Sequence, residues 1–131
     1  MRQIPIGAKG EYSLVVTAEH LANRFKDAML PAVLATPVLV MIMENAALNA
    51  IKTYLNPTES AVGTRIDVIH LAATPIGLTA TAKAEVTGVD GRRIEFRIDA
   101  TDGIERIGTA THERVLIDKV KFEERLKLKG G

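Results

Sequence analysis

The feature that most constrains the fold of this chain is the stretch ATPVLVMIMENAALNAI, residues 35–51. Apart from Glu44 and two asparagines, the stretch consists almost wholly of apolar and small residues. Thr36 followed by Pro37 predicts the start of a helix with the Thr36 hydroxyl as N-cap, and the helix is expected to run to about Leu55. A helix that is apolar nearly all round cannot face water, so the rest of the chain must cover it.

The second half of the chain carries the patterns of β-strands. Asp90-Gly91 and Asp102-Gly103 predict hairpin turns between runs in which apolar and polar side chains alternate. The segments expected to form strands are residues 11–18, 61–74, 77–86, 93–101 and 104–117. We therefore predict an α+β fold of the hot-dog type, in which a curved antiparallel sheet of about five strands wraps a long central helix.

Two further segments are predicted to be helical or loosely ordered. Residues 17–30 place three apolar side chains at a spacing of four, which predicts a short amphipathic helix ended by Pro31. Those side chains are Leu21, Phe25 and Met29. The charged tail, residues 119–131, is expected to be a short solvated helix or a loose end. Since 131 residues suffice for one core and are too few for two, we expect a single domain over 1–131.

Composition excludes several classes of function. The chain has no cysteine, so disulfides, zinc–thiolate sites and thiol catalysis are excluded. The formal net charge is +1, and lysines alternate with glutamates in the tail, which argues against a nucleic-acid partner. The longest apolar run is far shorter than the ~20 residues that span a bilayer, and residues 1–14 lack the apolar region typical of a signal peptide. We expect a cytoplasmic protein without a membrane partner.

Glu44 is the residue that most needs an explanation. On a helical wheel the polar residues Asn45, Asn49 and Lys52 form their own stripe, centred about 110° from Glu44. The residues within about 60° of Glu44 are apolar: Val40, Met41, Ala47, Leu48, Ile51 and Leu55. One explanation is a structural acid with a buried partner or at a subunit edge. The other is a desolvated carboxylate that acts as general base or nucleophile.

Several residues are candidate partners of Glu44. Strand alternation puts His70 on an apolar face, where it is either a core histidine or a partner of the carboxylate. Thr36 is either only an N-cap or a hydroxyl beside the reacting centre. Gly63 marks a bulge or a close approach of substrate, and Gly108 has the same two interpretations. His112, flanked by charged residues, is interpreted as a polar strand position.

At these residues the chain resembles a known family. The segments TPVLVMIMENAA, GTRIDVIHLAATPIGL, VDGRR and DGIERIGTATHERVLI are similar to the fluoroacetyl-CoA thioesterase type of hot-dog thioesterase. The resemblance implies a catalytic Thr36, Glu44 and His70, with Gly63 and Arg114 at the substrate. It also implies a homodimer, or a higher oligomer, that hydrolyses an acyl-CoA near the subunit interface without a metal or other cofactor.

The resemblance breaks down just before Thr36. Asp27 and Leu30 stand where the fluoroacetyl-specific enzyme carries phenylalanines that cover the acyl group. Leu30 is therefore expected to line a less aromatic acyl pocket, and selectivity for fluoroacetyl-CoA is not carried over. The expected function is hydrolysis of a short-chain or small acyl-CoA. A hot-dog hydratase or dehydratase and a non-catalytic acyl-CoA binding module remain as alternatives.

Overall fold

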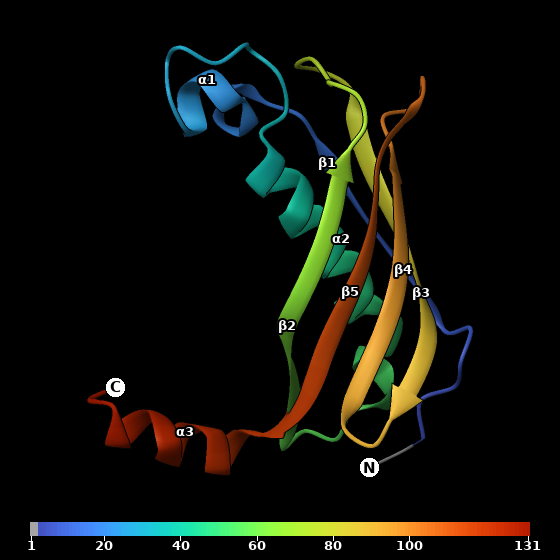
Figure 1. Cartoon of the computed structure of the whole chain (residues 1–131), viewed down its shortest axis with the longest axis vertical. Coiled ribbons are helices and arrows are strands. Elements are labelled where there is room, and N and C mark those ends of the chain that lie inside the picture. The colour runs from blue at the N-terminus through green and yellow to red at the C-terminus, as the bar shows by residue number, and fades with distance from the viewer. Residues whose placement is uncertain (1–2) are drawn as a thin grey trace.

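The structure, a computed structural model that describes residues 3–131, is an antiparallel sheet curled around one long helix (Figure 1). The strands are β1 (Lys9–Val15), β2 (Glu59–His70), β3 (Thr79–Asp90), β4 (Arg93–Thr101) and β5 (Arg106–Asp118). They lie in the order β1-β3-β4-β5-β2, so β1 and β2 are the edges. The predicted hot-dog fold with five strands and a central helix is confirmed.

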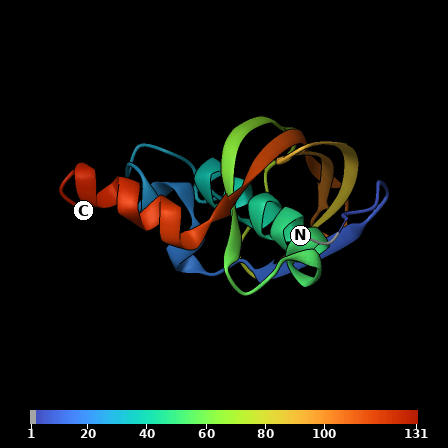
Figure 2. The ribbon, with the colours of Figure 1, turned by 90° about the horizontal axis from the view of Figure 1, so that it is seen from below.

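The central helix is α2 (Thr36–Ile51), continued by one 3₁₀ turn, Lys52–Tyr54. Seen from below, the sheet curls around it (Figure 2). Its sheet-facing side is buried against alternate residues of β3 and β4, of which those on β3 are mostly alanines. These small side chains let the helix lie close to the strands. The core residues of β3 and β4 are Ala80, Ala82, Ala84, Val86, Ile94, Phe96, Ile98 and Ala100.

Gly10 on β1 lies very close to the backbone of α2. A Cβ built on Gly10 would clash with the backbone nitrogen of Ala50 and lie 2.5 Å from the carbonyl oxygen of Ala46. Backbone atoms of a packed helix cannot move aside cheaply, so Gly10→Ala should destabilise the protein by about 3 kcal/mol or more. Gly88→Ala is the matched control, because its Cβ would meet the flexible side chain of Glu95. Equal unfolding midpoints for the two variants in urea would contradict this packing.

The amphipathic helix predicted over residues 17–30 is wrong. The segment forms a 3₁₀ turn (Ala18–His20) and the single helical turn α1 (Ala22–Phe25), separated by Leu21 in an extended conformation. Asp27 then accepts a hydrogen bond from the backbone N–H of Met29, 2.9 Å away, and turns the chain. Met29 is consequently 91% exposed, and of the three spaced apolar residues only Leu21 is buried.

The charged tail forms the helix α3 (Lys119–Leu128). Asp118 caps it by accepting a hydrogen bond from the N–H of Lys121, and none of its side chains is buried. The helix projects away from the curled sheet in both views (Figures 1 and 2). Within residues 3–131, none of the helices combines the length and the apolar character needed to cross a membrane.

Candidate active site

The first part of the site lies where α2 begins and β2 ends. The predicted N-cap is wrong by one residue: Ala35 is the N-cap, and its carbonyl accepts from the N–H groups of Val38 and Leu39. Thr36 is the first helical residue, and its hydroxyl oxygen lies 2.9 Å from Nδ1 of His70. The Thr36 hydroxyl therefore hydrogen-bonds to His70 and does not cap α2.

This pair opens on a cleft of about 410 Å³. Its walls are mainly aliphatic, with Lys26 as the one charged residue that lines it. The lining residues are Ala22, Lys26, Leu30, Pro31, Val33, Leu34, Thr36, His70, Leu71, Ala72 and Ala73. Leu30 lines the cleft, and Asp27 is not among its walls; that the acyl group contacts Leu30 stays a prediction. The cleft is of a size that suits a small organic group.

The second part of the site surrounds Gly63 on β2. A Cβ at Gly63 would lie 2.9 Å from Oε2 of Glu44, 3.4 Å from Cε1 of His112 and 3.7 Å from Nη1 of Arg114. Three polar side chains therefore converge on Gly63, which has no side chain of its own to keep them away. The interpretation of Gly63 as a bulge is confirmed, because the strand register shifts between Gly63 and Arg65. The approach of substrate to Gly63 stays a prediction.

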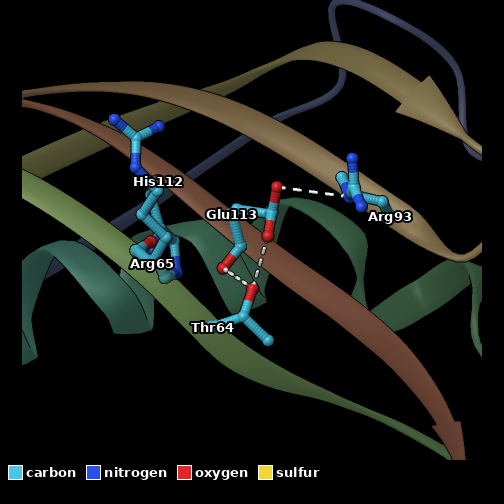
Figure 3. Close-up of polar contacts among 5 residues, drawn as sticks. All are labelled: Thr64, Arg65, Arg93, His112 and Glu113. Atoms are coloured by element: carbon cyan, nitrogen blue, oxygen red, sulfur yellow. Dashed lines mark hydrogen bonds and ion pairs between the residues drawn. The ribbon is translucent and has the colours of Figure 1, made fainter.

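A set of contacts on the other face of β5 fixes this bulge. Thr64 is the extra residue, and its hydroxyl donates to Oε2 of Glu113, 2.8 Å away. Glu113 also pairs with Nε of Arg93 on β4, at 3.3 Å. Figure 3 shows Glu113 between these two partners. The bulge that exposes Gly63 to Glu44 is thus tied to its neighbour β5 and, through Glu113, to β4.

His112 and Arg114 form a buried polar pair beside Glu44. His112 Nδ1 lies 2.7 Å from the carbonyl oxygen of Arg65, and its Nε2 lies 3.2 Å from Nη1 of Arg114. Nη2 of Arg114 donates to the carbonyl of Ala61 at 2.7 Å. His112 is only 3% exposed, so its interpretation as a polar strand position is wrong. The alternation along β5 that buries Ala110 and Leu116 also points His112 inward.

One chain does not bring the two parts together. Thr36 and Glu44 are two turns apart on α2, which separates them by about 12 Å. Gly63 lies in the first half of β2 and His70 at its end, which separates them by roughly 20 Å. Within residues 3–131 no hydrogen bond or ion pair joins Glu44 to Thr36 or His70. The three predicted catalytic residues therefore form two half-sites: Thr36 with His70, and Glu44 with Gly63 and Arg114.

The two site histidines should make the folded protein less stable in mild acid. Burial lowers the pKa of His70 from 6.5, against an opposing hydrogen bond with the Ala72 backbone. Burial is also the largest cause that lowers the pKa of His112 from 6.5, followed by the Arg65 hydrogen bond, which raises it. As pH falls below about 6.5, the unfolded chain takes up more protons than the folded one, and the free energy of unfolding decreases.

Urea unfolding at a series of pH values measures this effect. The free energy of unfolding should be nearly constant between about pH 7 and 8 and should decline toward about pH 5. The decline should be shallower in His112→Gln, which lacks one of the two groups. A free energy that stays constant down to about pH 5 would show that neither imidazole is held in its neutral form.

Comparison with known proteins identifies the family of this chain. Residues 16–120 match the family described as fluoroacetyl-CoA-specific thioesterase. The chain belongs to this family. A fluoroacetyl-CoA thioesterase from Streptantibioticus cattleyicolor is 41% identical over 129 residues, which cover 95% of this chain and 93% of that protein.

Solved structures of related thioesterases share the fold over nearly the whole chain. A variant of the fluoroacetyl-CoA thioesterase FlK in complex with fluoroacetate is 38% identical, with a TM-score of 0.89 over 95% of this chain and 98% of the other. A thioesterase superfamily member from Thermus thermophilus is 30% identical, with a TM-score of 0.89 over 98% of this chain and 97% of the other. The family predicted from the sequence is confirmed.

Proposed function

We propose that this protein hydrolyses the thioester of a small acyl-CoA, releasing a carboxylic acid and the thiol of coenzyme A. The observation that carries the proposal is the Thr36–His70 pair in the wall of an aliphatic cleft, in a chain of the fluoroacetyl-CoA-specific thioesterase family. A hydroxyl within hydrogen-bond reach of an imidazole is an arrangement suited to acyl transfer.

The complete site is assembled from two copies of the chain. Each copy holds two half-sites too far apart to act on one carbonyl, and each presents an apolar α2 face that its own sheet leaves partly uncovered. On that face Met41 is 39% exposed and Val40 and Leu48 are half-buried. The neighbouring strand β2 is a sheet edge with unpaired backbone groups. A symmetric homodimer through these surfaces sets Thr36 and His70 of one copy opposite Glu44 of the other.

In the assembled site the roles follow from chemistry. Glu44 acts as the general base for water or as the nucleophile at the thioester carbonyl. His70 accepts or returns a proton through Thr36, and the amino-terminal end of α2 stabilises the negative charge that develops on the carbonyl oxygen. Arg114 supplies a positive charge next to Glu44.

The acyl group occupies the cleft beside Leu30. Because neither phenylalanine nor tyrosine lines it, recognition there rests on shape and aliphatic contact. Such walls discriminate weakly between groups that differ by one methylene. We therefore propose short aliphatic acyl-CoAs as the substrate class, without the selectivity for fluoroacetyl-CoA named in the family description.

Thiol release is the decisive assay. The protein is incubated with saturated acyl-CoAs of increasing length, with fluoroacetyl-CoA and with an enoyl-CoA, and both free thiol and hydrated product are measured. The proposal predicts thiol from the short saturated substrates. Hydration of the enoyl-CoA without thiol would establish a hydratase instead, and saturable binding without any turnover would establish a binding module.

Gly63→Ala tests the role of the Glu44 half-site. The new methyl carbon would lie 2.9 Å from Oε2 of Glu44. Because this oxygen is the end of a flexible side chain, the carboxylate moves aside while the fold is kept. A displacement of about 1 Å at a catalytic group can cost up to 10²-fold in rate, and we expect kcat to fall by tenfold or more. The unfolding midpoint should stay close to that of the wild type. Unchanged kcat would mean that the carboxylate position does not matter.

A further inference from the structure

The buried ring of His112 has a protonation state that its two hydrogen bonds define. Its Nδ1 lies 2.7 Å from the Arg65 carbonyl, which can only accept, so Nδ1 must carry a proton. Its Nε2 lies 3.2 Å from Nη1 of Arg114, which can only donate, so Nε2 must be unprotonated. Both bonds are satisfied together only by the neutral imidazole with its proton on Nδ1.

Arg114 depends on this acceptor. Arg114 as a whole residue is only 9% exposed, and among the described residues no carboxylate lies within 4.0 Å of its guanidinium. The atoms that hold the guanidinium in place are Nε2 of His112 and the carbonyl oxygen of Ala61. The Glu44 carboxylate acts on it electrostatically from across Gly63. A buried cation loses much of its stabilisation when one of two such acceptors is removed.

The surroundings keep the His112 ring in place. The groups that face it come from four elements: Arg114 of β5, Glu44 of α2, Arg65 of β2 and Phe96 of β4. Glu113, on the other face of β5, acts on it electrostatically. The Phe96 ring stacks on the imidazole with centroids 5.6 Å apart. Burial and the positive charge of Arg114 favour the neutral ring, whereas the two carboxylates and the Arg65 carbonyl favour the charged one.

We infer that His112 is a positioning residue: as the neutral imidazole it holds the Arg114 guanidinium beside Glu44, and its protonation releases that guanidinium. A protonated Nε2 has no lone pair for Arg114 and brings a second positive charge to within 3.2 Å of it. The consequence of this arrangement for hydrolysis rests on the proposed function. The hydrogen bonds of His112 with Arg65 and Arg114 are independent of that function.

Two amide variants separate the two bonds of the ring. His112→Gln can place its amide oxygen near the position of Nε2 and accept from Arg114. His112→Asn can place its amide N–H₂ near the position of Nδ1 and donate to the Arg65 carbonyl, but it does not reach Arg114. Because each variant loses one hydrogen bond, a purely structural role predicts similar effects of the two on every readout.

Nitrogen-15 NMR of the full chain without substrate tests the inference. We expect the His112 ring to be protonated on Nδ1 and unprotonated on Nε2 at neutral pH. Rotation of the Arg114 guanidinium should be about tenfold or more faster in His112→Asn than in the wild type or His112→Gln, because a hydrogen bond from a charged donor is lost. In the wild type the same acceleration should accompany protonation of His112. A ring protonated on Nε2, or equal rotation in all three proteins, would overturn the inference.

Kinetics then connect the pair to catalysis. On a thioester that the wild type hydrolyses, kcat of His112→Asn should fall about tenfold, and that of His112→Gln should stay within about threefold. If no thioester is hydrolysed, the proposed function fails while the NMR result stands. If the wild type hydrolyses the thioester but His112→Asn and His112→Gln have equal kcat, the positioning role is disproved and the proposed function stands. The wild-type measurements remain decisive even when a variant does not fold.

Discussion

Replacing Glu44 by glutamine should lower kcat for acyl-CoA hydrolysis by at least about 10²-fold while leaving the fold intact. The amide has the size of the carboxylate but can neither accept a proton from water nor attack a carbonyl. Glu44 is half-buried within an apolar face of α2, and none of its carboxylate oxygens is hydrogen-bonded to another described residue. Few structural contacts are therefore lost with the charge.

The comparison needs a matched carboxylate elsewhere. Glu85→Gln changes an exposed glutamate on the outer face of β3 and should leave kcat within about threefold of the wild type. Urea unfolding should give similar midpoints for both variants. A folded Glu44→Gln protein with near-native turnover on every thioester that the wild type accepts would remove Glu44 from the mechanism.

The sheet and the central helix were predictable because their signals repeat over many residues. Alternation over β3 and β4 and the apolar run of α2 each involve ten or so positions that all agree. Residues 17–30 offered only three spaced apolar side chains, and local turns override so weak a pattern. The predicted start of α2 was correct to within one residue. The N-cap, however, is Ala35 and not Thr36.

The site was predictable in its residues more than in its geometry. The alternation that placed His70 on an inner face applies equally to His112, but its charged neighbours made the position look polar. Gly63 suggested the bulge in β2 as one of two interpretations, but the approach of Glu44 to Gly63 also depends on how α2 packs against that strand, which no local pattern in the sequence shows. The separation of the half-sites appears only when helix and strand are placed together.

That separation leads to the second large effect, activity regained by mixing two inactive variants. In a symmetric dimer with composite sites, a His70→Ala copy paired with a Glu44→Gln copy has one site with both lesions and one with none. The purified mixed dimer should therefore recover about half of the wild-type kcat per dimer, whereas each variant alone stays at least about 10²-fold below it.

The reverse pairing sharpens the test. A wild-type copy paired with a copy that carries both substitutions has one lesion in each composite site, so this dimer should be nearly inactive. Sites contained within single chains predict the opposite for both pairings. Size-exclusion chromatography with light scattering should first show a mass of twice 14.2 kDa for every preparation.

The most direct measurement is thus thiol release by these two mixed dimers, each purified through a different tag on each copy. About half the wild-type rate in the first and almost none in the second is the result expected for a thioesterase whose active site joins Thr36 and His70 of one copy to Glu44 of the other. An inactive first dimer together with a half-active second one would contradict it.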